Sequence, residues 1–104
     1  LALDEKRPPF KADLWTGTIN DDQCVEQRWF PGVHSNVGGG YEDTGVSDLA
    51  LTWMIGKSEQ LGLGFDQQFI ESLKPHFNGE LYDSFSPMYH LFETFPFHVF
   101  CSFL

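Results

Sequence analysis

Basic residues, cysteines and long apolar runs are all scarce in this sequence of 104 residues. Six lysines and arginines stand against fifteen acidic residues, so the formal net charge at pH 7 is -9. Because a polyanion repels phosphate backbones, we expect no nucleic-acid partner. The two cysteines, Cys24 and Cys101, lie far apart and form no CxxC pair. A disulfide scaffold is therefore not expected, and an intracellular or neutral redox setting is the default.

The hydropathy and charge pattern of the sequence also predicts no membrane-spanning segment and no export signal. The most apolar stretch, residues 91 to 104, is too short to span a bilayer and is interrupted by Glu93 and Pro96. The opening LALDEKRPPF lacks the charged-then-apolar order of a signal peptide. We therefore expect no transmembrane segment. The localisation stays unknown, with the cytoplasm favoured.

Aromatic residues, in contrast, are abundant. Eleven phenylalanines, three tryptophans and three tyrosines offer the ring area that a small domain needs for its core. Both ends look truncated, because the sequence begins at Leu1 without an initiator methionine and stops inside a phenylalanine-rich run. We expect a single partial domain over residues 1 to 104. The apolar tail, residues 93 to 104, is either a truncation artefact or packs on its own core.

The middle of the chain predicts a strand, a loop and a helix in that order. CVEQRWF, residues 24 to 30, favours a strand because it mixes β-branched and aromatic residues. Pro31 ends this strand, and the glycine-rich residues 31 to 46 predict a loop. A helix follows at about 48 to 61, capped by Ser47 or Asp48.

A second, shorter helix is predicted after Asp66, which would cap it, and it should end before Pro75. Residues 1 to 22 are expected to be extended or looped, with Trp15 as their anchor. The predicted fold class is therefore α/β, with a terminal strand, a loop that carries a histidine, a helix and an otherwise irregular remainder.

His34 lies in the predicted loop, where strand, glycine-rich loop and helix follow one another. In open α/β sheets such loops line the ligand crevice, and a histidine held there can transfer protons near neutral pH. On these local grounds a structural histidine in a turn is as reasonable as a catalytic one.

The string QRWFPGVHSNVGGGYEDTGVSDLALTWMI resembles the signature of a family of α/β hydrolases that includes the type VI secretion phospholipase effectors of bacteria (Tle1-like) and many fungal proteins. ALDEKRPPF upstream and GELYDSFSPMYHLF downstream are similar to flanking segments of that family. The resemblance implies the C-terminal part of an α/β-hydrolase catalytic domain. It also implies a Ser, acid, His triad in which His34 is the base, and no cofactor.

The serine elbow of such hydrolases is absent. No G-x-S-x-G occurs, because Ser35 and Ser47 both lie in other contexts. The resemblance therefore implies that the nucleophile and the triad acid belong to a missing N-terminal part of the domain. Whether this chain acts as an enzyme is uncertain, and the segment alone is expected to be inactive.

Other sites fit the sequence less well. Gly56-Lys57-Ser58 resembles the end of a P-loop, but Leu51 stands where that motif needs glycine. The four histidines, with Asp43 and Asp48, show no metal-type spacing. Asp43 and Asp48 could orient His34. Alternatively, Asp43 is a solvated loop carboxylate and Asp48 is a helix cap. Trp53 and Met54 are expected in the core.

Two functions stay open at this point. The first is a portion of a serine hydrolase that acts on an ester or lipid substrate through His34. The second is a non-catalytic, truncated module that binds a protein partner through its apolar C-terminal end.

Overall fold

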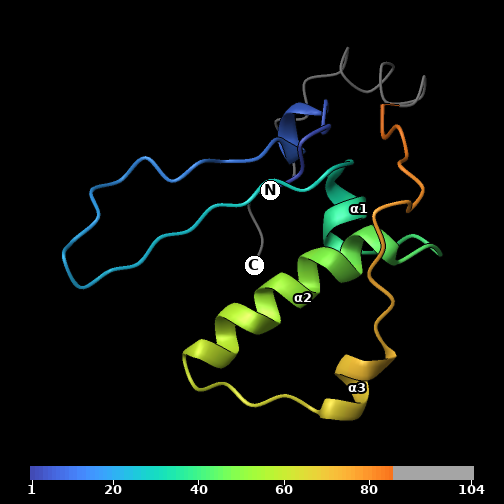
Figure 1. Cartoon of the computed structure of the whole chain (residues 1–104). Helices are drawn as coiled ribbons and strands as arrows, with labels where there is room; N and C mark the ends of the chain where they lie inside the picture. Colours follow the sequence, from blue (N-terminus) through green and yellow to red (C-terminus); the bar gives the residue numbers. More distant parts are fainter. Residues whose placement is uncertain (86–104) are drawn as a thin grey trace, which may run out of the picture.

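The computed structural model describes residues 1–85. Within this range the chain forms a short 3-10 helix, η1 (Pro8–Phe10), followed by the α-helices α1 (His34–Gly38), α2 (Gly45–Gln60) and α3 (Gln67–Ser72). Figure 1 shows α1 beside the first turns of α2, while the chain after α2 turns back along the helix and carries α3 toward the same end. The apolar tail, residues 93 to 104, lies outside the described residues.

The prediction of an α/β-hydrolase fold with a terminal strand is wrong. The described residues contain no strand and no sheet, and residues 24 to 30 form only one isolated parallel bridge, between Phe30 and Ala2. Backbone hydrogen bonds from Phe30 N to Leu1 O (2.8 Å) and from Leu3 N to Phe30 O (3.0 Å) accompany it. A strand needs a partner along its whole length, and here the pairing begins only at the last residues of the run.

The helix predicted near residues 48 to 61 is confirmed as α2, although it begins three residues earlier. Its C-terminus is a Schellman motif, in which Gly62 has φ +89° and donates to Glu59 O at 2.9 Å, and Leu63 N donates to Ser58 O at 3.1 Å. The predicted cap is wrong. Ser47 and Asp48 lie inside the first turn, and Asp43 instead accepts the N–H of Gly45 at 2.9 Å.

The short helix predicted after Asp66 is confirmed as α3. The Asp66 carboxylate accepts the backbone N–H groups of Gln68 (2.8 Å) and Phe69 (3.4 Å), which have no partner inside the helix. The helix ends at Ser72, before Pro75.

The prediction that residues 31 to 46 are all loop is wrong, because α1 interrupts them. Gly32 makes the turn into α1 with φ +91°, a conformation that other L-residues rarely adopt. Asn36, one turn into the helix, accepts the Val33 N–H on its side-chain oxygen at 3.1 Å and so closes the helix start. Five residues are too few to show the helical apolar spacing that identifies longer helices in a sequence.

Replacing Gly32 with Ala should destabilise the fold. A Cβ there would lie 2.6 Å from the Asn36 Cβ, in addition to the unfavourable φ. We expect a loss of about 1–3 kcal/mol in the free energy of unfolding, measured by urea titration. Gly38→Ala is the control, because its Cβ would meet nothing within 4 Å and its φ is not positive. Equal effects of the two substitutions would contradict this account of Gly32.

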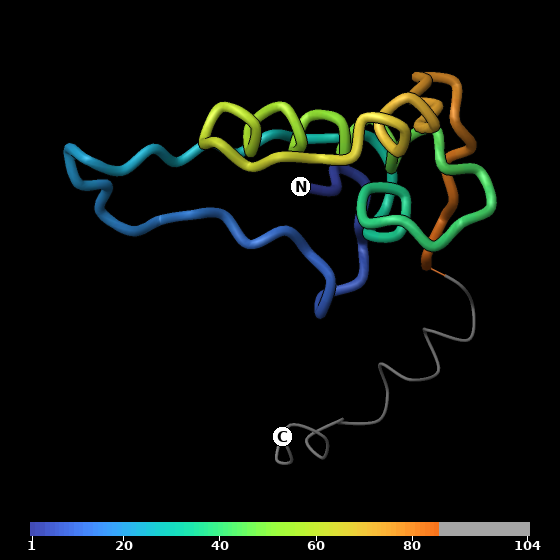
Figure 2. Tube along the Cα trace, turned by 90° about the horizontal axis from the view of Figure 1, so that it is seen from below, coloured from blue at the N-terminus to red at the C-terminus, as the bar shows by residue number. Residues whose placement is uncertain are grey.

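The buried apolar core of the described residues is small and comes from α2 and from the residue that precedes α1. Its members are Val33, Val46, Ala50 and Ile55. Figures 1 and 2 both show the chain between η1 and Phe30 leaving this body as a long open loop. Trp15, expected to anchor that region, is 54% exposed, so that expectation is wrong. No helix in the described part of the chain is long and apolar enough to cross a bilayer.

Candidate functional site

His34 is the first residue of α1, and its imidazole is exposed. The Phe10 ring lies against it, with the ring centroids 5.2 Å apart and the planes inclined by 58°. Its backbone N–H donates to Glu5 Oε2 at 3.0 Å. The histidine is therefore fixed at its main chain, while its ring nitrogens remain open to a reacting group.

The Glu5 side chain beneath His34 is fully buried and ionically paired. Arg7 donates to it from Nε (2.9 Å), from Nη2 (2.8 Å) and from its backbone N–H (2.9 Å), and Ser84 Oγ donates at 3.0 Å. The Arg7 hydrogen bond holds the pKa of the Glu5 carboxyl well below its usual range, with help from the backbone N–H of His34 and against the effect of burial. Three segments distant in sequence meet at this carboxylate.

Asn36 joins the histidine helix to the last described segment. Its amide is buried, donates to Glu80 O at 2.9 Å, and accepts the Tyr82 N–H at 3.3 Å. Tyr82 stacks on Tyr41 with ring centroids 3.9 Å apart. These contacts are those of a residue that holds the backbone.

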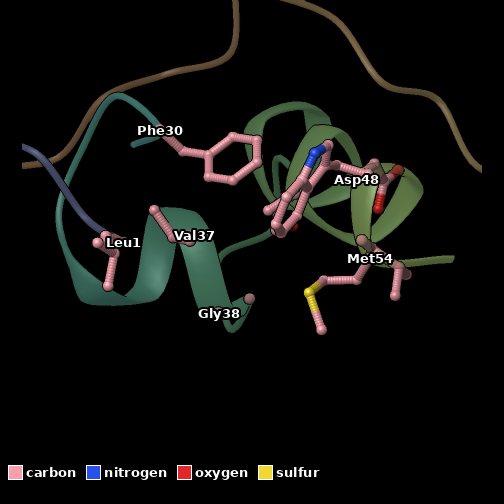
Figure 3. Close-up of a pocket in the computed structure, with 11 residues that line it drawn as sticks. Leu1, Phe30, Val37, Gly38, Asp48 and Met54 are labelled. Carbon is pink, nitrogen blue, oxygen red and sulfur yellow. The ribbon is translucent and has the colours of Figure 1, made fainter. Parts of the chain in front are cut away.

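Two hollows adjoin at α1 and share Leu1, Val37 and Gly38 as lining residues. The larger, of about 420 Å³, is bounded mainly by apolar side chains of α2 and by Phe30. Figure 3 shows Leu1, Val37 and Phe30 on one side of it and Met54 on the other. The smaller, of about 340 Å³, is lined by His34 and Phe10.

The expectation that Trp53 and Met54 are core residues is wrong. Both line the larger hollow, and Met54 is 54% exposed. Helical spacing predicts that one face of α2 is apolar. It does not show whether that face packs against other side chains or borders an open hollow.

Asp43 and Asp48 do not orient His34 within the described residues. Asp48 is buried and accepts from Thr44 Oγ1 (3.0 Å) and from Lys74 N (2.9 Å). Asp43 accepts the N–H of Glu80 at 2.9 Å and lies 3.5 Å from Nε2 of another histidine, His76. The backbone N–H groups of Glu80 and Gly45 lower the pKa of the Asp43 carboxyl.

The remaining candidates are also placed by the structure. Gly56 to Ser58 lie in the interior of α2, where no loop could wrap a phosphate. Within residues 1–85, no three histidine, cysteine, aspartate or glutamate side chains come together as metal ligands would. His90 and His98 lie outside the described residues.

Comparison with protein families relates the chain to a known enzyme class. Residues 1–57 match the family described as T6SS, Phospholipase effector Tle1-like, catalytic domain. The match covers more than half of the 104 residues. The chain belongs to this family. No curated protein and no solved structure matches the chain.

Membership makes this Tle1-like chain part of a phospholipase-like hydrolase. The matched range contains Glu5, Phe10 and His34, and all but the end of α2. The wider grouping with fungal proteins stays a prediction.

The structure adds residues that sequence reasoning did not single out, namely Glu5, Arg7, Phe10 and Ser84. Glu5 carried one available signal, since an acid two residues before an arginine can form a local ion pair. The contacts of that pair with residues 34 and 84 depend on the fold, however, and no spacing rule predicts them.

Proposed function

We propose that this Tle1-like chain supplies the general base, His34, of a serine hydrolase that cleaves an ester, with a phospholipid as its substrate. His34 would accept the proton of a nucleophilic serine and return it to the leaving alcohol. The observation that carries the proposal is the exposed imidazole of His34 in a hollow beside a larger apolar one, within the family-matched range.

The larger hollow supports a lipid substrate in particular. Its lining from Phe30, Leu51 and Met54 suits the acyl chain of an ester, since apolar surface buried on binding contributes favourably. The hollow adjoins that of His34 along Val37 and Gly38, so an acyl chain seated there would extend toward the imidazole.

The nucleophile would come from polypeptide outside residues 1 to 104, because no G-x-S-x-G occurs within them. The family resemblance implies the same origin for the acid. The alternative, a non-catalytic module that binds through its apolar end, depends on residues 93 to 104. Those residues lie outside the described range, and no observation favours that function.

An assay of phospholipid vesicles and a soluble fluorogenic ester tests the proposal. A full-length enzyme that contains this chain should hydrolyse both and be inactivated by an organophosphonate that modifies serine. The 104-residue chain alone should hydrolyse neither, because a histidine without a nucleophile activates nothing. Hydrolysis by the isolated chain, or a full-length enzyme indifferent to the organophosphonate, would contradict the proposal.

A further inference from the structure

We propose that Glu5, Arg7 and Phe10 act as positioning residues that hold both the main chain and the ring of His34. This inference rests on the proposed function for its catalytic consequence, although its structural part can be tested alone. The four residues form a closed circuit, in which each contacts the next and Phe10 and Glu5 both contact His34.

The first arm of the circuit holds the backbone. Glu5 Oε2 accepts the His34 N–H at 3.0 Å, and this N–H is in the first turn of α1, where no helical carbonyl can accept it. The Glu5 side chain has no exposed surface, so water does not compete for that oxygen. The start of α1 is thereby fixed relative to residues 5 to 7.

The second arm holds the ring. The Arg7 guanidinium that binds Glu5 also lies over the Phe10 ring, with Cζ 4.2 Å from the ring centroid. The Phe10 ring in turn contacts the His34 imidazole. Pro8 and Pro9 begin η1 and restrict its backbone, which keeps Phe10 at a defined distance from Arg7.

Both arms are needed because fixing the main chain alone leaves the imidazole free to rotate about χ1 and χ2. A base must lie within hydrogen-bond distance of the proton that it removes. Phe10 restricts that rotation from one side, while the ring nitrogens of His34 stay accessible to a reacting group. Arg7 connects the arms, since its planar fork binds a carboxylate and its face packs on a ring at the same time.

NMR of the 104-residue chain tests the geometry without any activity. Wild type should show NOEs between the Phe10 ring and the His34 imidazole protons. Arg7→Lys keeps the charge but loses the fork, and it should lose these NOEs. Arg28→Lys is the matched control, because Arg28 is exposed and lies outside the circuit. NOEs that survive in Arg7→Lys, or that are absent from wild type, would overturn the circuit.

Kinetics of the full-length enzyme test the consequence. Phe10→Leu should lower kcat by about 10- to 100-fold with KM within about twofold, because a misplaced base slows the reaction without weakening binding. Phe10→Tyr keeps the ring and should restore kcat. Phe77→Leu is the control, since Phe77 is 86% exposed.

The outcomes separate this inference from the proposed function. If His34→Ala abolishes hydrolysis while Phe10→Leu and Arg7→Lys leave kcat unchanged, His34 is the base and the positioning role is wrong. If His34→Ala leaves hydrolysis unchanged, the proposed function fails, and NOEs lost in Arg7→Lys would still establish the circuit as a structural one. A change in KM alone in Phe10→Leu would assign Phe10 to substrate binding and overturn its positioning role.

Discussion

Replacing His34 with Ala in the full-length enzyme should lower kcat for ester hydrolysis by about 10⁴- to 10⁶-fold. The serine hydroxyl is a weak nucleophile at neutral pH, and its proton has no other acceptor once the imidazole is removed. Since the His34 imidazole is exposed and the main-chain bond to Glu5 remains in the variant, the substitution should leave the far-UV circular dichroism and the urea midpoint close to wild type. Initial rates on phospholipid vesicles give the measurement.

His76→Ala is the matched control for this experiment. His76 is also half-exposed and has a carboxylate beside it, since Asp43 Oδ1 lies 3.5 Å from its Nε2. It therefore has the Asp–His pairing that a triad search would select, but neither of the two hollows includes it. We expect its loss to change kcat by less than about threefold. A collapse of activity in His76→Ala, with His34→Ala unaffected, would transfer the role of base to His76.

The helices that sequence reasoning predicted are those whose signals are local. Asp66 caps α3, and Gly62 ends α2, through contacts within a few residues of each. Such contacts join residues that are close in sequence, so they form independently of the tertiary structure. The candidate base, His34, was likewise selected from a local string of residues, and its role stays a prediction.

The failed predictions required partners that no local pattern specifies. Residues 24 to 30 have strand-forming side chains, but only Phe30 has a bridge partner in the described part of the chain. β-propensity expresses how well a side chain fits a paired surface, so it has little effect where the pairing is absent. The prediction that Asp48 caps the helix failed for a similar reason. Its carboxylate accepts the backbone N–H of Lys74, 26 residues away, and no local pattern indicates that contact.

Glu5 shows the same limit for the site. Its side chain binds residues 2, 29 and 79 positions away along the chain. In the sequence it is one of fifteen acidic residues, most of which are solvated. Only the fold distinguishes it, by burying it completely.

Replacing Glu5 with Gln should therefore cost more stability than any other carboxylate substitution in the described residues. The amide matches the carboxylate in shape but loses the charge that pairs with the largely buried guanidinium of Arg7. Breaking a buried pair from one side costs about 3–5 kcal/mol in the free energy of unfolding. Urea titration of the 104-residue chain at pH 7 gives this value, with the exposed Glu71→Gln as control. A loss below about 0.5 kcal/mol, typical of surface substitutions, would show that the buried pair adds little.

The pH dependence of stability supplies an independent measure of the same carboxylate. The pKa of Glu5 is lowered in the folded state, so the unfolded chain binds a proton first when the pH falls below the ordinary value of 4.5. Wild-type stability should thus be complete above that pH and decrease below it, as Glu5 approaches its folded pKa. Arg7 is the cation that faces Glu5, while the carboxyls of the half-buried Asp43 and the exposed Asp83 also have lowered pKa values and add to the acid sensitivity. Because Glu5→Gln retains those two aspartates, the difference between the two unfolding curves isolates Glu5. That difference should narrow steadily from pH 5 toward pH 2, and a constant gap would mean that the pKa of Glu5 is the same in the folded and the unfolded chain.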